Sequence, residues 1–503
     1  MGVPRIWQLY NYNQSANYSY GKESLVVPSS NFIVEAALRE RMTAFSDDWN
    51  FFTGNHWAYD SEDAGFQQFT YNFCRKFINT LAYHTIGKGF DLTIGPEFAD
   101  TEKLLNYIWD LNNSVFYLFE ACQVMGTFGG TFLAYHVTQD PFTGFIYPQF
   151  DVWLPLHTVP EWDDSDKYAL KKVTYFWVGK AKNKEGDVVP ALFKEERTKE
   201  RIKRTYQASE EEFSVFDQIN PFDSIGVIYV SNYPNASVVE GLSDIVDVKE
   251  INKKFNKDVT ILDEILEYHG SPTTIITGAS AGNLEAGQNN IYSIANDKAK
   301  VYNLEMDSDL PVHKENIEMN RSAMHSFANY PEKLNGGLDR VSNTSGAAIE
   351  MMYQQLIEKA DIKKASLTRG IQLLNAEVMN FFLQRGFNLK LPKAKIPYSP
   401  DTIYSKLTDI SINSTIPKDR LRELQVLITK LNNGLIDTEE ALVRLKDYEN
   451  IPEALKKIEA ERKKRLLEER ISMGMKSGDM KSATNDPQEI KLDEDKALMS
   501  RSI

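Results

Sequence analysis

The chain has 503 residues, of which 42% are hydrophobic, 12% aromatic and 25% charged, a composition ordinary for a globular protein of several domains. Its formal net charge of −14 argues against tight DNA binding through the overall field, because phosphate contacts need clustered Lys and Arg. No apolar run approaches the roughly 18 residues of a membrane span, and the first residues lack the basic and apolar regions of a secretory signal.

The two cysteines, Cys74 and Cys122, each lie in an apolar stretch with helical spacing. Two cysteines are too few for a disulfide framework or a cysteine-rich metal site. We therefore predict two buried free thiols in a protein of a reducing cytosol.

The N-terminal part is predicted to be helical after an extended arm. Residues 1–30 are polar, with tyrosines among Asn and Ser, and we expect them to become ordered only on a partner. Apolar residues recurring every three or four positions then predict helices over 32–52, 68–85 and 100–126. Gly54-Asn55 is expected to end the first helix, and residues 87–95 indicate a turn and a short strand.

From Thr131 to about Val230 the pattern indicates strands. The candidates are 131–137, 145–150, 171–179 and 225–230. The first two flank the turn QDPFTG, which is typical of a hairpin. A basic stretch at 195–207, followed by acidic residues, is interpreted as an exposed strand pair with a solvated loop.

A helix is predicted from Val238 to about His269, on the order of 45 Å long. One face carries an apolar stripe that must pack against something, and neighbouring copies of the chain would serve. The other face alternates in sign; it comprises Asp244, Lys249, Glu250, Lys253, Lys254, Asp258, Asp263 and Glu264. Two strands, at 271–278 and 298–306, and a second helix over 311–327 follow.

The segment NYPEKLNGGLDRVSNTS, residues 329–345, is the longest loop expected between two helices. Loops of this length are uncommon in compact domains and are usually functional or disordered. The helix predicted after it, 346–382, would be about 55 Å long if continuous. Its polar stretch EKADIKK, residues 358–364, is a candidate for a bend.

The C-terminal part is predicted to consist of short helices and a tail. After loop and strand material at 386–416, helices are expected over 418–432, 437–448 and 452–470. Gly434 marks a sharp turn between the first two helices. Residues 473–503 are expected to be disordered.

Motifs of catalysis, cofactor binding and metal binding are absent from the sequence. There is no P-loop, HExxH or CxxC, and the seven histidines have no i,i+4 pair that would hold a metal. The acidic stretch EWDDSD, residues 161–166, lacks the ligand spacing of a calcium loop and is interpreted as a solvated turn. We expect no catalytic residue, no metal and no cofactor.

One segment leaves an enzyme as an alternative. GASAG, Gly278–Gly282, is a literal GxSxG, and a strand is predicted before Ser280. A nucleophile elbow also needs a helix directly after the serine. The sequence that follows, NLEAGQNN, is a poor helix start, so a flexible loop is favoured over a serine hydrolase.

Four segments taken in order resemble phage portal proteins of the SPP1-like type, the rings through which DNA enters and leaves the capsid. They are YNFCRKFINTLAYHTIGKGFDL (71–92), the stretch from NYPNAS to SPTTIITG (232–278), SNTSGAAIEMMYQQLIEKADIKKASL (342–367) and LNNGLIDTEEALVRL (431–445). The third stretch is the most specific. Another helical virion or scaffold assembly protein is the remaining alternative.

The resemblance implies an α+β, mainly α, portal fold assembled as a ring, typically a dodecamer. The implied parts are an N-terminal arm (1–30), a wing (31–237), a stem helix (238–269), a clip (270–310), a second stem helix (311–328), a tunnel loop (329–345), a long wing helix with its return to the wing (346–416), a helical crown (417–472) and a disordered tail (473–503). The roles of the arm and of an insertion at 180–215 have no counterpart in the resemblance.

The same resemblance implies a structural protein of the virion's portal vertex, assembled in the host cytoplasm, with no enzymatic activity. Implied partners are the terminase large subunit, major capsid and scaffolding proteins, a head-completion or adaptor protein, and double-stranded DNA held weakly and without sequence preference. The loop residues expected to contact DNA are Lys333, Asn335 and Arg340.

Overall fold

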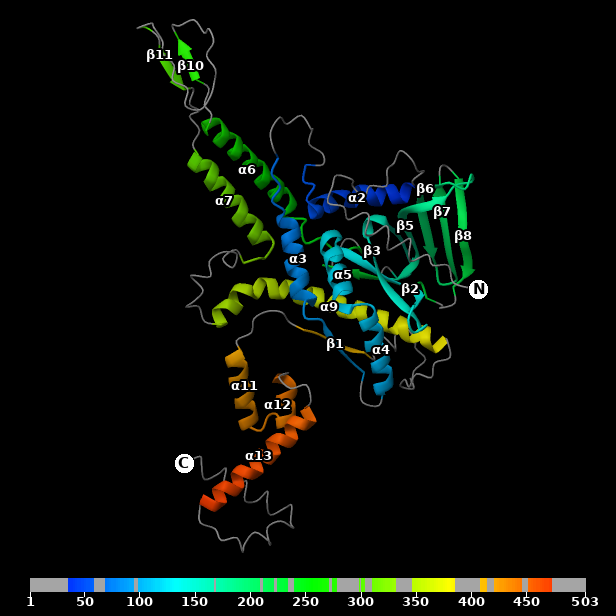
Figure 1. Cartoon of the computed structure of the whole chain (residues 1–503), viewed down its shortest axis with the longest axis vertical. Helices are drawn as coiled ribbons and strands as arrows, with labels where there is room; N and C mark the ends of the chain where they lie inside the picture. The colour runs from blue at the N-terminus through cyan, green and yellow to red at the C-terminus, as the bar shows by residue number, and fades with distance from the viewer. Residues whose placement is uncertain are drawn as a thin grey trace. The chain divides into compact units, whose positions relative to one another are not determined.

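The structure is a computed structural model that divides the chain into two compact units, Met1–Ile416 and Pro417–Ile503. The fold is mixed α/β with helix predominating, as predicted (Figure 1). The residues it describes are 35–57, 68–94, 98–166, 169–208, 211–220, 224–233, 239–270, 274–277, 298, 300–303, 310–331, 346–384, 408–413, 420–445 and 451–472. The arm predicted at 1–30 and the tail at 473–503 lie outside them.

The first helices of the chain form largely where apolar periodicity predicted them. They are α2 (Ala36–Thr53), α3 (Phe73–Ile86), α4 (Ala99–Leu111) and α5 (Ser114–Phe128). Gly54 ends α2 in the left-handed conformation, φ 97°, as expected. The single helix predicted over 100–126 was wrong. Asn113 takes φ 49° between α4 and α5, a left-handed conformation that breaks the helix and that Asn tolerates better than most residues.

A three-stranded antiparallel sheet, in the order β3-β2-β9, follows α5. Its strands are β2 (Gly130–Gln139), β3 (Ile146–Trp153) and β9 (Val227–Ser231). The predicted hairpin between β2 and β3 is confirmed, with Gln139 paired to Ile146 beside the turn. A short 3₁₀ helix, η2 (Pro155–His157), leads into the next sheet.

A five-stranded antiparallel meander runs β4-β5-β6-β7-β8. Its strands are β4 (Thr158–Trp162), β5 (Leu170–Lys182), β6 (Val188–Arg197), β7 (Arg201–Ala208) and β8 (Glu211–Ile219). The strand pair predicted around 195–207 is observed as the end of β6 and β7. The predicted exposure was wrong for Glu195 and Arg197, whose side chains are buried. β8 is an outer strand of the sheet, and its residues are mostly exposed.

Two helices and a β-hairpin follow. α6 (Lys249–Gly270) and α7 (Leu310–Phe327) pack on each other, and β10 (Thr274–Thr277) pairs with β11 (Lys300–Asn303). The prediction that α6 begins at Val238 was wrong. Residues 239–248 are not helical, so that α6 is about 33 Å long.

The helix α9 (Gly346–Gln384) is continuous over 39 residues, roughly 60 Å. The polar stretch EKADIKK interrupts its apolar stripe but not its helical hydrogen bonding. Within this stretch Ala360 and Lys363 are fully buried. After α9, β12 (Asp409–Ile412) pairs with β1 (Phe90–Thr93), two strands more than 300 residues apart in sequence.

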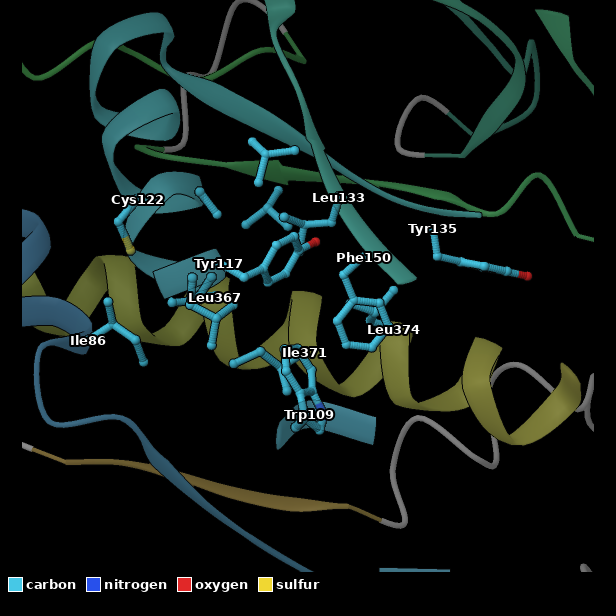
Figure 2. Close-up of a cluster of buried hydrophobic side chains, with 14 of the residues drawn as sticks. Ile86, Trp109, Tyr117, Cys122, Leu133, Tyr135, Phe150, Leu367, Ile371 and Leu374 are labelled. Atoms are coloured by element: carbon cyan, nitrogen blue, oxygen red, sulfur yellow. The ribbon is translucent and has the colours of Figure 1, made fainter. Parts of the chain in front are cut away.

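The main core forms where α9 packs against α3, α4, α5 and the β2–β3 hairpin (Figure 2). Leu367, Ile371 and Leu374 on α9 recur at helical spacing and are fully buried. The side chains that meet them come from the other elements: Ile86, Trp109, Tyr117, Cys122, Leu133 and Phe150. Burial of this apolar surface is the main free energy that holds the elements together.

The second unit contains three helices in its described part. They are α11 (Arg420–Asn432), α12 (Thr438–Leu445) and α13 (Ile451–Ser472). Gly434 adopts φ 66° in the turn between α11 and α12, which confirms the predicted turn. Asp437 caps α12 by accepting a hydrogen bond from Glu440 N (2.6 Å).

Candidate functional site at the root of the α7–α9 loop

The chain leaves α7 through a short turn that is fully hydrogen-bonded. Tyr330 N donates to His325 O (2.9 Å), and Asn329 N donates to Ser326 O (3.1 Å). Asn329 is left-handed, φ 57°, which Asn adopts at lower cost than most residues. The turn ends α7 and directs Tyr330 towards α3.

Tyr330 is held by an aromatic group on α3 and α7. Its ring centroid lies 5.3 Å from that of Phe77 and 5.4 Å from that of His325. Lys76 Nζ lies 5.5 Å from the centre of the Tyr330 ring, which adds a cation–π attraction. Burial, and then the nearby Arg321, lowers the pKa of Lys76.

The other side of the loop is also anchored on α3. Near the start of α9, Leu356 and Ala360 are buried against Leu81 of α3, and both Tyr330 and Tyr353 pack on this cluster. The Tyr353 ring lies 5.8 Å from that of His84. One helix therefore fixes both ends of the segment that connects α7 to α9.

α3 is in turn held by a row of polar side chains on α6. Asn252 Oδ1 accepts from Phe73 N (3.1 Å) and Cys74 N (3.3 Å), and its Nδ2 donates to Tyr71 O (2.8 Å). These bonds satisfy amides at the N-terminus of α3, which no intrahelical carbonyl can reach. The row continues at every fourth residue: Asn256 Oδ1 accepts from Tyr71 N (2.9 Å), and Thr260 Oγ1 accepts from Phe69 N (3.2 Å).

A second polar contact joins α6 to α7. Asp258 Oδ2 accepts hydrogen bonds from Asn316 Nδ2 and Asn320 Nδ2, both at 2.8 Å. Its other oxygen pairs with Lys254, one helical turn earlier. The Asp258 side chain is only 8% exposed, so the carboxylate is satisfied by these three partners rather than by water.

A buried ion pair links α9 to the segment that precedes α6. Lys363 Nζ, fully buried, bonds to Asp244, and Lys359 Nζ lies 3.6 Å from the same carboxylate. Asn232 Nδ2 donates to Asp244 Oδ1 (3.2 Å), and Asp244 N donates to Gly126 O (2.8 Å). Asp244 thus joins α9 to Asn232, which follows β9, and to the end of α5.

Close backbone contact holds residues 239–248 against the end of α5. A Cβ on Gly129, which has φ 83°, would lie 2.1 Å from Gly241 O, so only glycine fits there. Ser243 Oγ donates to Thr127 O (2.7 Å), which satisfies a carbonyl at the end of α5. Residues 239–248 therefore cross the end of α5 instead of continuing α6 backwards.

The residues proposed from the sequence to touch DNA, namely Lys333, Asn335 and Arg340, lie outside the described residues, and so does Ser280. The structure describes only the two ends of their loop. In the part of the chain that it describes, no three His, Cys, Asp or Glu side chains gather as a metal site would. In the EWDDSD stretch, Glu161 and Trp162 end β4. The predicted turn follows at residues 163–166, where Ser165 N donates to Asp163 Oδ1 (2.7 Å).

Both cysteines are buried free thiols, as predicted. Burial is the largest cause that raises the pKa of each to about 12, so neither is a reactive thiolate at neutral pH. No helix in the described ranges has the length and apolar character needed to cross a bilayer.

Sequence reasoning missed the polar contacts that build this site. It placed Asp244 and Asp258 on a helix face of alternating charge and gave neither a partner. Asp244 precedes α6, and the two side chains are buried, at 3% and 8% exposed. A usable signal was present for α6: Asn252, Asn256 and Thr260 repeat at four-residue spacing beside the apolar stripe. No local signal pairs Asp244 with a lysine 119 residues away.

The family model described as "Phage portal protein, SPP1 Gp6-like" matches residues 33–466 of the chain. No curated protein matches it. Among solved structures, a chain of "Neck of native GTA particle computed with C12 symmetry" is similar at a TM-score of 0.45 and 11% identity, covering 80% of this chain and 92% of that one. A chain of "Virion of native gene transfer agent (GTA) particle" is similar at a TM-score of 0.42 and 11% identity, covering 86% and 98%.

Proposed function

The chain belongs to the SPP1 Gp6-like family of phage portal proteins, and from this premise we propose that its copies form a ring-shaped channel for double-stranded DNA at one capsid vertex. The observation that carries the proposal is the family match over residues 33–466. The ring is typically a dodecamer in this family. DNA passes through it during packaging and again during ejection.

Within this proposal, α6 and α7 are the stem, and the β10–β11 hairpin belongs to the clip. Residues 31–237 and 346–416 are the wing, and α11, α12 and α13 form the crown. The segment 329–345 is the tunnel loop. Its support is the way α3 anchors Tyr330 before the segment and Leu356 after it.

The proposed mechanism follows from electrostatics. A ring that held phosphates tightly would bind DNA with a strong, salt-dependent affinity that opposes translocation. A chain of net charge −14 repels DNA overall, and sparse contacts from Lys333, Asn335 and Arg340 touch it weakly as it passes. The ring forms the channel, and the terminase large subunit, which docks on the clip, drives DNA translocation.

Further partners follow from the same role. Major capsid and scaffolding proteins surround the ring during assembly in the host cytoplasm, and a head-completion or adaptor protein replaces the terminase once packaging ends. The mature location is the portal vertex of the virion.

Negative-stain images of the purified chain test the ring. We expect closed rings with a central hole. Filaments or monomers would favour another assembly protein, and a hydrolase activity lost in Ser280→Ala would favour the enzyme alternative.

The loop residues are tested separately, in variants that still form rings. Lys333→Ala combined with Arg340→Ala is expected to reduce DNA packaging or retention, whereas Lys314→Ala, at an exposed position on α7, leaves both unchanged. If the loop variant packages and retains DNA like the parent, these residues do not contact DNA, while the ring proposal stands.

A further inference from the structure

The five-stranded sheet has one face covered by a helix. Leu38 of α2 is fully buried against Phe176 of β5 and Leu192 of β6. In a strand, neighbouring residues point to opposite faces. Trp177 and Phe193, which follow Phe176 and Leu192 in sequence, therefore lie on the face that α2 does not cover.

An aromatic row crosses that second face from β5 to the outer strand β8. Trp177, Phe193, Tyr206 and Phe213 are direct cross-strand partners. Consecutive ring centroids are 5.3, 5.4 and 5.1 Å apart, with interplanar angles of 11°, 39° and 16°. The rings thus form an aromatic ladder in which the two outer pairs are stacked and the middle pair is tilted, a favourable cross-strand arrangement.

Small residues flank the ladder. The next row of cross-strand partners consists of Gly179, Ala191 and Ala208, and the two alanines are buried. Polar groups close both ends of this surface. At one end Arg204 stacks on Trp177 (5.3 Å) and pairs with Glu195, and at the other Lys184 pairs with Glu211 (2.9 Å).

Every hydrophobic member of this apolar cluster belongs to β5, β6, β7 or β8. At its β5 edge the cluster is continuous with other apolar residues, since Trp177 also packs on the group that contains Phe132 and Trp153. Trp177, Tyr206 and Phe213 remain partly exposed. A sheet face of this composition is normally buried by a second layer, and a bounded apolar surface is the usual sign of a binding partner.

We propose that residues 1–34 of the same chain are that second layer, lying across the aromatic ladder of β5–β8. The place where the described chain begins supports this. Glu35, directly before α2, accepts a hydrogen bond from Lys194 Nζ of β6 (2.5 Å), so the N-terminal segment leaves from this sheet. To reach the ladder, the segment must pass from β6 around the outer strand β8 to the other face of the sheet. This path spans two strand spacings and one layer thickness, about 20 Å in all, and takes roughly six to eight extended residues.

The composition of the segment fits this surface. Residues 1–34 contain six aromatic residues: Trp7, Tyr10, Tyr12, Tyr18, Tyr20 and Phe32. They contain only three charged ones, Arg5, Lys22 and Glu23. A nearly neutral, aromatic-rich segment loses little on desolvation and gains ring contacts on such a ladder. This contrasts with the acidic chain as a whole.

A photo-crosslinker placed on the ladder tests the assignment in the full chain. p-Benzoylphenylalanine in place of Phe213 is irradiated, and the adducts are located by protease digestion and mass spectrometry. We expect the dominant adduct to join this position to residues 1–34 of the same polypeptide. The same substitution at Phe142, which is 94% exposed in the β2–β3 turn, is expected to give no such adduct.

The crosslinker is also placed at Tyr206 of β7, so that the test does not depend on a variant that could disturb β8. Adducts from both ladder positions that fall outside residues 1–34, or that join two copies of the chain, would overturn the proposal. So would the absence of any adduct from a variant with the circular dichroism spectrum of the parent. None of these outcomes bears on the channel function, because the ladder does not belong to the α6–α7–α9 region.

Discussion

At the scale of single residues, the contact between Asp244 and Lys363 has the largest consequence. Both side chains are almost fully buried, and each charge has the other as its principal partner. Removing one member of such a pair leaves an uncompensated buried charge, whereas replacing both is often nearly neutral.

The prediction concerns Lys363→Met. Asp244 would keep only Lys359, at 3.6 Å, and Asn232 as polar partners, and we expect a loss of unfolding free energy of about 3 kcal/mol, measured by denaturant unfolding. Adding Asp244→Asn should restore much of this loss. The matched control is Lys364→Met, which removes only a pair with the exposed Asp361 and should cost less than about 1 kcal/mol.

A second residue-scale feature is the cluster of Glu195, Arg197 and Arg204 beside His136 of β2. Burial by itself would raise the pKa of Glu195, but the guanidiniums of Arg197 and Arg204 outweigh it and lower the pKa to about 2. Burial, and then the charge of Arg197, lowers the pKa of His136 to about 4. Glu195 therefore stays ionised and His136 stays neutral at physiological pH.

These shifts predict a loss of stability in mild acid. The unfolded chain binds a proton on His136 below about pH 6.5, whereas the folded chain does so only near pH 4. Stability from this group is complete above pH 6.5 and decreases as pH falls towards 4, by roughly 2 kcal/mol between pH 7 and pH 5. Glu195 adds to the loss only below about pH 4.5.

Unfolding midpoints at pH 7 and pH 5 measure this effect. His136→Gln should show a smaller difference between the two midpoints than the parent, and His313→Gln, on α7, should show the same difference as the parent. An equal difference in all three proteins would mean that His136 is not the responsible group.

At the scale of elements, α6 holds both the N-terminal end of α3 and the helix α7 through side-chain hydrogen bonds. One of its faces bonds to the backbone at residues 69–74 through Asn252, Asn256 and Thr260, and another bonds to α7 through Asp258. Since α3 anchors both ends of the α7–α9 loop, the position of that loop depends on α6 through two packing steps.

We predict that Asn252→Ala loosens the N-terminus of α3. The amide of Cys74 would lose its acceptor and that of Phe73 would retain Tyr71 O (3.1 Å), so we expect a cost of about 2 kcal/mol, mainly from the buried Cys74 donor. Hydrogen exchange should accelerate in the peptide that covers residues 71–76. Lys257→Ala, at an exposed position on the same helix, should leave that peptide unchanged, and equal exchange in both variants would contradict the capping role.

At the scale of the whole molecule, the chain consists of two compact units, Met1–Ile416 and Pro417–Ile503. All large hydrophobic clusters of the first unit are formed by residues before this boundary, the last being Ile410 and Ile412. The second unit buries a small set of residues, including Ile436 in the turn between α11 and α12, Leu442 on α12 and Ala454 on α13.

This separation predicts that a chain ending at Ile416 retains the fold of the first unit. Its thermal unfolding midpoint should lie close to that of the corresponding transition in the full chain, because the main hydrophobic cluster of the first unit is made of residues before this boundary. Scanning calorimetry of both chains checks this. Loss of the transition in the shorter chain would show that the second unit is required for folding.

The sequence by itself determined the elements whose pattern is local. The helix predicted over 311–327 is observed at Leu310–Phe327, and the hairpin around QDPFTG forms as expected, because apolar spacing and turn residues act over a few positions. The resemblance carried by four segments also led to the family. The anchors of the loop were not predicted, because Tyr330, Leu81 and Leu356 meet only when three helices pack together.

Only the tertiary structure decided where those elements break and what the polar residues do. Asn113 divides a continuous helical pattern, residues 239–248 leave the helix to cross α5, and Asp244 and Lys363 pair across 119 residues of sequence. The physical reason is the same in each case. A local pattern records which side of an element is apolar, whereas a buried charge or a left-handed residue is stable only through partners that the fold brings to it.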